Sequence, residues 1–370
     1  MPASRRNEIL IIQTAFLGDL LLTIPLLKAV REMWPECHLS ILCRSGFGSL
    51  LLRYRLVDEV IEVNKATRTS WRDAVDRLKK REFAYVFCPH ESFRSALLAA
   101  RLKGQIKIGY RRFFNRFIFS PRIVRPMQYP EVIRQLAMLA PVSKDWALRL
   151  QKFAEEWKET NEHQGGALAW VPDWASMQVE ELKEIRENMI KRRGSARKPV
   201  AFLAPGSVWP TKMWTANGYA ELARALINKN YEVFLMGSSS EISICEGISG
   251  SVPGVQSLAG QLSLVEVAER LARADILICN DSGAMHLAAL SGVPTVSIFG
   301  PTVIELGYRP WQNQARIVEL PLACRPCGKH GAKKCPLGTH ACMKDLGADF
   351  VLRQMDALLD LVDGRPQAGS

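Results

Sequence analysis

Residues 275–302 read DILICNDSGAMHLAALSGVPTVSIFGPT, and this stretch decides the predicted fold. The apolar run 276–279 is short enough to be a buried parallel strand, and a polar turn follows it at 280–283. A helix of small residues is expected at 284–290, before a Gly-Val-Pro sequence ends it. A second apolar strand is expected at 295–299. This strand–turn–helix–strand unit is typical of an open α/β sheet.

The polar turn lies where open α/β sheets bind ligands, at the carboxyl end of a strand. The first N–H groups of the next helix have no partner inside it, and they carry the positive end of its dipole. Gly283 has no Cβ, so an anion can come close to the backbone. Asp281 or Ser282 could instead cap the helix, and His286 lies one turn further on. The stretch therefore predicts either an anion-binding helix terminus or a capped helix with nothing bound.

The length and net charge of the chain limit the classes of protein to which it can belong. The 370 residues are enough for about two domains. A formal net charge of +12 predicts a face that attracts phosphates, nucleic acid or an anionic membrane. Arg5 and Arg6 precede an apolar run, as in a signal peptide, but Asp19 falls inside that run and no small-residue cleavage site follows. No apolar run reaches the length of a membrane span, so we expect a folded, cytoplasmic chain.

Strands and helices alternate along the first part of the chain. Elements of these lengths in this order predict a parallel, doubly wound sheet. The turn at Gly18 lacks the glycine pattern of a dinucleotide site. We expect strands at 8–13, 38–43, 59–63, 84–88 and 105–109, and helices at 19–33, 46–53, 70–80, 92–102 and 131–140.

A charged, mostly helical segment, 143–198, separates this pattern from a second one. Two Rossmann-like halves would place a cleft between them, where ligands commonly bind. The second pattern has strands at 200–204, 232–236, 275–279 and 295–299, and helices at 216–227, 241–248, 264–272 and 284–290. The predicted parts are an N-terminal domain with a helical extension (1–190), a linker (191–198), a C-terminal domain with a cysteine-rich segment (199–348), and a final helix with a tail (349–370).

Two more turns follow strands of the second domain. The turn APGSVWPTK, 204–212, offers backbone N–H groups around Ser207 and the ammonium group of Lys212, which together could hold a phosphate. Its spacing is not that of a Walker loop, and a surface loop with one exposed lysine is the alternative. The turn GSSSE, 237–241, adds Glu241, whose carboxylate could accept hydrogen bonds from ribose hydroxyls. We expect all these turns at one sheet edge.

Asp19 is the candidate catalytic group of the first domain. It follows Gly18 at an expected helix start, where capping is the ordinary role of an aspartate. The functional alternative is a general base toward a sugar hydroxyl, and the helix dipole would keep its carboxylate ionised.

Residues 92–130 hold nine basic residues and no acidic one, with phenylalanines interleaved. This composition indicates contact with a phosphorylated, lipid-bearing or nucleic-acid partner, and a merely solvated basic face is the alternative. The residues are Arg94, Arg101, Lys103, Lys107, Arg111, Arg112, Arg116, Arg122 and Arg125, with Phe113, Phe114, Phe117 and Phe119.

Four of the nine cysteines lie between Cys324 and Cys342, with Cys327 and Cys335 between them. In a cytosolic protein such clustering favours a metal over disulfides. The spacing is irregular for a zinc ribbon, so a structural zinc or iron, unligated core thiols and an opportunistic disulfide all stay open.

The motifs together resemble those of glycosyltransferase family 9, the ADP-heptose:lipopolysaccharide heptosyltransferases, and the cysteine segment is most similar to the heptosyltransferase II branch. The matching pieces are ILIIQTAFLGDLLLTIPLLKAV (9–30), LAPGSVWPTKMW (203–214), FLMGSSSE (234–241), SLAGQLSL (257–264), NDSGAMHLAALSGVPTVSIFGPT (280–302) and CPLGTHACM (335–343).

The resemblance implies an α/β fold of GT-B architecture, with two Rossmann-like doubly wound domains facing each other across a cleft. It implies inversion at the anomeric carbon with no cofactor or metal required for catalysis, Asp19 as the base and Lys212 at the leaving group. It places the donor at Ser207, Lys212, Glu241, Leu258, Ala259, Gly260, Asp281, Ser282, Gly283 and His286. We place the acceptor at Gly18, Arg111, Arg112 and Arg116.

We therefore expect an inverting transferase that moves heptose from ADP-L-glycero-β-D-manno-heptose to the inner core of lipopolysaccharide. The acceptor would be of the lipid A–Kdo type, and the enzyme would touch the cytoplasmic face of the inner membrane without spanning it. Another GT-B sugar-nucleotide enzyme, an epimerase or a transferase to a different acceptor, is one alternative. A nucleic-acid-binding protein is the other, and the lack of a compact basic recognition motif counts against it.

Overall fold

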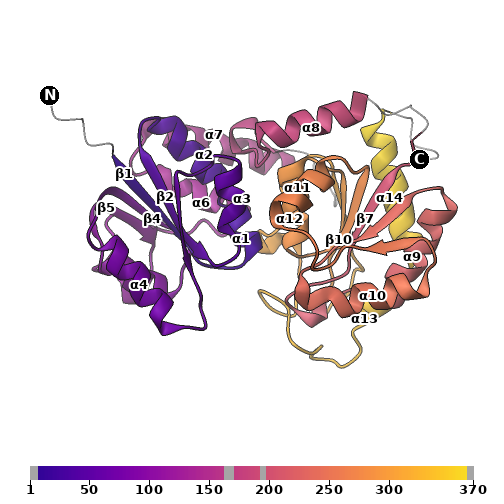
Figure 1. The fold of residues 1–370 in the computed structure, drawn as a ribbon. Coiled ribbons are helices and arrows are strands. Elements are labelled where there is room, and N and C mark those ends of the chain that lie inside the picture. The colour runs from indigo at the N-terminus through magenta and orange to yellow at the C-terminus, as the bar shows by residue number, and fades with distance from the viewer. Residues whose placement is uncertain (1–6, 162–170, 192–196, 365–370) are drawn as a thin grey trace. The chain divides into compact units, whose positions relative to one another are not determined.

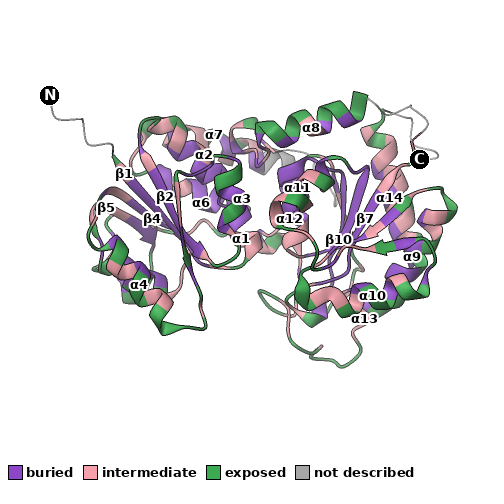
Figure 2. Ribbon diagram, in the orientation of Figure 1, coloured by how far each residue is buried: buried purple, intermediate pink, exposed green. Residues whose placement is uncertain are grey.

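The computed structural model describes residues 7–161, 171–191 and 197–364. The chain forms two compact units, Met1–Glu162 with Pro172–Ala175, and His163–Val171 with Ser176–Ser370. Each unit is built on a six-stranded parallel sheet. Figure 2 shows that the strands of both sheets are largely buried. The predicted pair of Rossmann-like α/β domains is therefore confirmed.

The sheet of the first unit has the strand order β3-β2-β1-β4-β5-β6, which is the doubly wound Rossmann order. Its central strand β1 (Glu8–Gln13) carries the apolar run Ile9–Ile12, which is fully buried because both faces of a parallel sheet are covered. The other strands are β2 (His38–Arg44), β3 (Glu59–Val63), β4 (Glu82–Cys88), β5 (Lys103–Tyr110) and β6 (Arg122–Ile123).

The helix expected at 19–33 is in fact two helices, α1 (Leu17–Leu21) and α2 (Ile24–Met33). Pro25 explains the break, because proline has no N–H to continue a helix and is favoured in a first turn. The remaining helices of the first unit are α3 (Gly48–Arg53), α4 (Arg68–Leu78), α5 (Phe93–Ala100), α6 (Glu131–Leu136) and α7 (Lys144–Asn161), with 3-10 turns η1 (Phe113–Asn115), η2 (Ala137–Leu139) and η3 (Asp173–Ala175).

The second unit repeats the same topology, with the strand order β9-β8-β7-β10-β11-β12. Strand β7 (Val200–Ala204) pairs with β8 on one side and with β10 on the other, so the connections reverse direction between β7 and β10. The other strands are β8 (Glu232–Leu235), β9 (Val255–Ser257), β10 (Ile276–Asn280), β11 (Thr295–Ile298) and β12 (Ala315–Val318).

The helices of the second unit include α8 (Glu180–Lys191), which packs against α11 and α12. Arg186 of α8 donates a hydrogen bond to the carbonyl of Ala274, at the end of the loop before β10. The structure therefore groups α8 with the second unit, whereas the sequence pattern ends the first domain at residue 190. The others are α9 (Ala216–Asn228), α10 (Ile242–Ser251), α11 (Leu264–Ala272), α12 (Gly283–Ser291), α13 (Ala341–Lys344) and α14 (Ala348–Val362), with 3-10 turns η4 (Pro210–Lys212), η5 (Ser239–Glu241) and η6 (Ile304–Leu306).

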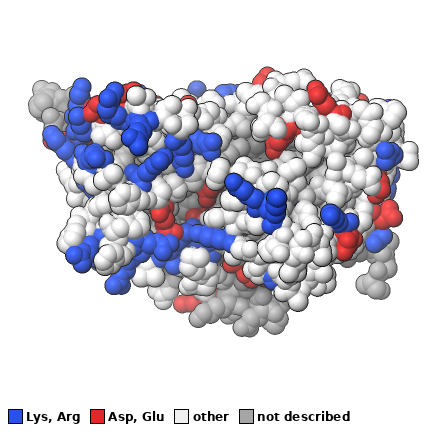
Figure 3. Space-filling view, turned by 90° about the horizontal axis from the view of Figure 1, so that it is seen from below, with Lys and Arg blue, Asp and Glu red and all other residues white. Residues whose placement is uncertain are grey.

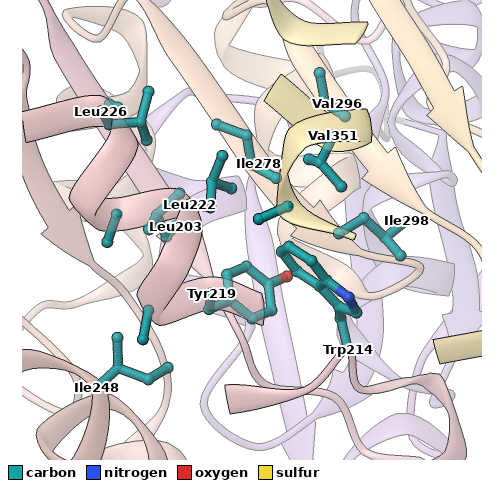
Figure 4. Close-up of a cluster of buried hydrophobic side chains, with 14 of the residues drawn as sticks. Leu203, Trp214, Tyr219, Leu222, Leu226, Ile248, Ile278, Val296, Ile298 and Val351 are labelled. Carbon is teal, nitrogen blue, oxygen red and sulfur yellow. The ribbon is translucent and has the colours of Figure 1, made fainter. Parts of the chain in front are cut away.

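The core of the second unit fixes the loop that follows β7. Trp214 and Tyr219 are fully buried, and their ring centroids lie 4.9 Å apart (Figure 4). Trp214 Nε1 donates to the carbonyl of Leu346 at 3.0 Å. Side chains from α14, among them Val351, complete the cluster, so the predicted final helix is part of this unit. Most of the predicted linker and tail, 192–196 and 365–370, lies outside the described residues.

Candidate functional site

Three loops of the second unit leave the carboxyl ends of the neighbouring strands β10, β7 and β8. They begin at Asp281, Pro205 and Met236, which follow those strands directly. Because all three strands are parallel, the loops share one edge of the sheet. That edge includes the reversal between β7 and β10, which is the usual ligand position in a doubly wound sheet.

Lys212 and Asp281 form a buried ion pair at this edge. Lys212 Nζ donates to Asp281 Oδ2 at 2.5 Å, and their side chains are only 11% and 6% exposed. Thr302, in the loop after β11, donates its hydroxyl to the same oxygen at 2.6 Å. Asp281 is therefore not the helix cap that the sequence allows, since its carboxylate binds the lysine and the threonine. The ammonium group is fixed beside the first turn of α12.

The N-terminus of α12 carries no side-chain cap. Ser282 is the N-cap residue, and it makes no capping hydrogen bond through its side chain. Gly283 begins the helix, which places bare backbone at the positive end of the helix dipole. Together with Lys212, this end of α12 suits an anionic group such as a phosphate.

Asn280 holds the loops after β7 and β10 together, and sequence reasoning did not single it out. Its side-chain Nδ2 donates to the carbonyl of Pro205 at 2.8 Å, and its Oδ1 accepts from the backbone N–H of Trp214 at 3.0 Å. Tyr219 donates its hydroxyl to the same Oδ1 at 3.2 Å. The signal available in the sequence is a polar residue that ends an otherwise apolar strand.

His286 lies one turn into α12 and is buried. Burial lowers the pKa of its imidazole to about 4; Asp281 opposes this shift and Lys212 adds to it. The ring is therefore neutral at pH 7, and it cannot act there as a cation for a phosphate. His286 lies in the same first turns of α12 as Gly283, and its predicted contact with the donor stays a prediction.

Glu241 bridges the loops after β7 and β8. Its Oε2 accepts from the backbone N–H of Ser238 at 2.6 Å and from the Ser238 hydroxyl at 2.8 Å, which caps η5. A Cβ on Gly206 would come within 1.8 Å of Glu241 Oε1, so a larger residue there would displace the Glu241 carboxylate from its present position. Ser207 follows directly and accepts a long hydrogen bond, 3.4 Å, from the N–H of Trp209. The structure thus brings Ser207 and Glu241 together.

The stretch 258–260 joins the same edge after β9. Leu258 N–H donates to the carbonyl of Leu235, and Gly260 N–H donates to that of Gly237, both at 2.9 Å. Gly260 has a φ of +72°, and a Cβ there would come within 2.8 Å of the Ile242 side chain. Ala259 between them is buried. All the predicted donor residues therefore lie on the second unit, in the loops that follow β7 to β10 or in the first turns of α12.

The cysteine-rich segment packs against the loop that carries Lys212. Thr211 donates its hydroxyl to the carbonyl of Ala332 at 2.5 Å, and His340 Nε2 lies 2.8 Å from the carbonyl oxygen of Thr211. The Arg325 guanidinium bonds the carbonyls of Gly300 and Thr302, in the loop after β11. This segment braces two of the loops at the sheet edge.

The four clustered thiols do not form a metal centre as placed. Among the residues that the structure describes, no three His, Cys, Asp or Glu side chains are positioned to hold a metal ion. Cys324 is exposed and Cys342 buried. Burial raises the pKa of the Cys342 thiol to about 11, and Arg325 opposes this shift.

Asp19 is the third residue of α1, and the N-cap is Phe16. The capping role allowed by the sequence is therefore wrong for Asp19. Its carboxylate, half-buried in the first turn, influences the nearby Lys65. Burial lowers the pKa of Lys65, Arg44 and Arg94 lower it further, and Asp19 raises it. Asp19 thus lies close enough to Lys65 to interact with it electrostatically.

A buried polar network supports the turn before α1, and no sequence signal marked it. Thr14 Oγ1 lies 2.9 Å from His90 Nδ1 and 3.2 Å from the Ser95 hydroxyl. Burial lowers the pKa of His90 to about 4, and Lys65 contributes in the same direction. His90 follows β4, so this network ties together the loops after the two central strands, β1 and β4.

The basic stretch 92–130 is only partly a solvated surface. Arg112 Nε donates to Glu91 at 2.7 Å, and the buried Arg125 pairs with Glu91 and Glu131. Arg111 is exposed, and so is Arg116, whose guanidinium lies 4.4 Å from the ring centroid of Phe117. Of the three arginines predicted to bind the acceptor, Arg111 and Arg116 face solvent while Arg112 is paired.

A model of glycosyltransferase family 9 (heptosyltransferase) matches residues 71–337. The chain belongs to this family. Lipopolysaccharide heptosyltransferase 2 of Escherichia coli (strain K12) is 24% identical over 364 residues, covering 95% of this chain and 98% of that protein. Lipooligosaccharide heptosyltransferase 2 of Campylobacter jejuni (serotype O:2) is 36% identical over 178 residues, or 46% of this chain, and the match spans only about half, 53%, of that relative.

The fold agrees with this membership. The structure of E. coli ADP-heptose lps heptosyltransferase II superposes with a TM-score of 0.71 at 22% identity, covering 96% of this chain and 99% of that one. The family-9 chain thus has the two Rossmann-like domains that its sequence motifs predict. In the described part of the chain, no helix is both long and apolar enough to cross a membrane.

Proposed function

We propose that this family-9 chain transfers heptose from ADP-L-glycero-β-D-manno-heptose to the inner core of lipopolysaccharide. The observation that carries the proposal is the buried Lys212–Asp281 pair beside the uncapped start of α12. The uncapped helix start offers positive potential for a pyrophosphate, and the pair fixes the Lys212 ammonium group beside it, at the sheet edge where doubly wound folds bind ligands. The heptosyltransferase 2 relatives, matched over nearly the whole chain, support the heptose donor and the lipopolysaccharide acceptor.

The donor would lie along the three loops. Its diphosphate would approach Lys212, Ser282 and Gly283, and its ribose would meet Glu241. The adenine would rest on the stretch 258–260. Lys212 and the helix terminus would stabilise the negative charge that develops on the departing ADP, which is the contribution a divalent metal makes in other sugar-nucleotide enzymes.

The chemistry we propose is a single displacement with inversion. An acceptor hydroxyl attacks the anomeric carbon while the bond from that carbon to the diphosphate oxygen breaks. The hydroxyl proton passes to the carboxylate of Asp19, and the electron pair leaves with ADP. Asp19 suits this role because it carries a half-buried carboxylate in the first turn of α1, directly after the loop that follows β1. Gly18, Arg111, Arg112 and Arg116 would contact an acceptor of the lipid A–Kdo type.

Such an acceptor is anchored in a bilayer, so we further propose a cytoplasmic enzyme in peripheral contact with the inner membrane. No cofactor is required for catalysis in this proposal. A structural zinc or iron at the four cysteines would have no part in the reaction.

The test uses purified protein with ADP-heptose, a lipid A–Kdo acceptor and excess EDTA. We expect a heptosylated product by mass spectrometry, with inverted anomeric configuration by NMR. Simple epimerisation of the sugar nucleotide, or transfer only to an unrelated acceptor, would contradict the proposal. Mass spectrometry of the lipopolysaccharide core from a deletion strain gives an independent check, since the missing sugar identifies the acceptor position.

A further inference from the structure

A groove on the first unit is lined mainly by residues outside the proposed donor and acceptor sites. It has a volume of about 860 Å³ and is formed by α4, by α5 and by the loop before α4. Its apolar wall comes from Trp71, Val75, Leu97 and Leu98. Trp71 and Val75 pack against the buried core of the unit, so the wall is part of the rigid fold.

The rim of the groove is strongly basic. Among the described residues that line it, Asp76 is the one carboxylate, and Lys79 neutralises it at 2.6 Å. Arg68 and Arg101 form no ion pair with any residue that the structure describes. Figure 3 views the molecule from the side on which α4 lies in Figure 1, and Lys and Arg side chains gather over the first unit there. The basic lining residues are Lys65, Arg68, Arg72, Lys79, Arg94 and Arg101.

Exposed aromatic side chains continue the apolar surface beyond the groove. Phe93 begins α5 and is 61% exposed, and one helical turn later Leu97 lines the groove. The Phe93 ring contacts that of Phe114 at 5.7 Å, edge to face. Phe113 and Phe117 next to it are 89% and 87% exposed. Apolar rings that face solvent beside uncompensated cations are typical of a surface that enters a lipid headgroup layer.

We infer that the α4–α5 groove and these phenylalanines dock the enzyme on a bilayer of anionic phospholipid, with an acyl chain against Trp71 and Leu97 and phosphate groups at the arginine rim. Charge complementarity selects this occupant, because a neutral apolar partner would leave Arg68 and Arg101 without an anionic partner among the described residues. The inference rests on the proposed function in one respect: a lipid-anchored acceptor requires the enzyme to act at the membrane surface.

Vesicle co-sedimentation of the full chain tests the inference, with phosphatidylcholine vesicles that contain or lack phosphatidylglycerol. Each basic side chain near an anionic surface contributes about fivefold to binding. The triple change Arg68→Gln, Arg72→Gln and Arg101→Gln should therefore weaken binding to the anionic vesicles about 100-fold. The control is Arg224→Gln, Arg270→Gln and Arg353→Gln, three exposed arginines of the second unit, which alters the net charge equally and should leave binding nearly unchanged.

A second pair of variants probes the apolar wall. Leu97→Asp places a carboxylate in the groove, while Leu148→Asp does the same on the exposed face of α7. We expect Leu97→Asp to weaken vesicle binding at least tenfold and Leu148→Asp to leave it unchanged. ADP affinity and the circular dichroism spectrum serve as checks that each variant is folded. Equal effects of the two changes would overturn the inference.

A water-soluble, deacylated acceptor separates membrane docking from acceptor binding. The groove variants should transfer sugar to it at the wild-type rate, and an equal loss on this substrate would assign the groove to the acceptor and overturn the inference. If the wild-type chain binds anionic vesicles through the groove but transfers no heptose, the proposed function fails and the docking surface stands. If it transfers heptose while no groove variant alters vesicle binding, the inference alone fails.

Discussion

Removing the ammonium group of Lys212 perturbs both the stability of the second unit and the proposed donor site. In Lys212→Ala, the buried carboxylate of Asp281 keeps only the Thr302 hydroxyl as a partner. Breaking one side of a buried pair costs about 3–5 kcal/mol, because the remaining charge is uncompensated. For a unit of this size, that corresponds to a fall of about 10 °C in Tm. The exposed pair Lys229–Asp356, at 3.0 Å, is the matched control, and Lys229→Ala should cost about 1 kcal/mol or less.

The same change should weaken ADP binding. A charge-assisted contact to the diphosphate is worth about 1.5–3 kcal/mol, so its loss lowers affinity about 10- to 100-fold. The unpaired Asp281 then adds repulsion toward the incoming phosphates. Combining Asp281→Asn with Lys212→Ala removes both that repulsion and the buried charge. The double variant should therefore recover most of the lost stability and part of the lost affinity.

Calorimetry with excess EDTA measures ADP affinity, and thermal unfolding measures stability, for both single variants and the double variant. An ADP affinity of folded Lys212→Ala within about twofold of wild type would refute a lysine contact with the diphosphate. Full dependence of wild-type binding on Mg²⁺ would refute metal-free donor binding. A double variant no more stable than Lys212→Ala would show that the uncompensated charge of Asp281 is not the cause of the stability lost in Lys212→Ala.

Three further outcomes are expected. Asp19→Asn should lower turnover about 10²- to 10⁴-fold with ADP affinity nearly unchanged, and wild-type turnover would remove the base assignment. If the four cysteines hold a metal, the chain purified under reducing, chelator-free conditions should contain about one zinc or iron, and Cys327→Ser should lower stability more than turnover; elemental analysis without metal rejects this. Stability should fall as pH drops from 6.5 to 4 and level off below, because His286 and His90 bind protons in the unfolded chain, whereas their pKa values in the folded chain are about 4. His286→Gln should flatten that fall in denaturant midpoints, and an unchanged slope would contradict it.

The sheets were predictable because their strands are apolar runs bounded by turns. Strands β1, β3 and β7 begin and end at the predicted residues. The strands that were missed, β6, β9 and β12, are two to four residues long and lie toward the sheet edges, where no long apolar run is needed. The helix at 19–33 was predicted too long because its apolar periodicity continues through Pro25, although the backbone hydrogen bonds cannot.

The site was predictable at the level of loops rather than of contacts. Parallel topology places the carboxyl ends of β10, β7 and β8 at one sheet edge. The loops that follow these strands are therefore neighbours, whichever side-chain contacts form between them. Which partner Asp281 selects depends on the path of the loop after β7, and that path is fixed by Trp214 and Asn280, many residues apart. Long-range contacts of this kind leave no local pattern, and the same holds for the Thr14–His90 network.

Thr211 links the cysteine-rich segment to the donor loops, so a substitution in that segment can change ADP binding indirectly. The hydroxyl and carbonyl of Thr211 are both bonded by that segment, through Ala332 and His340, and the next residue is Lys212. A change at Cys335 or Cys342 that loosens the segment would therefore release the backbone that aims the Lys212 ammonium group. Loss of ADP affinity in such a variant would come from a displaced lysine, so it would not by itself assign a thiol or a metal to the reaction.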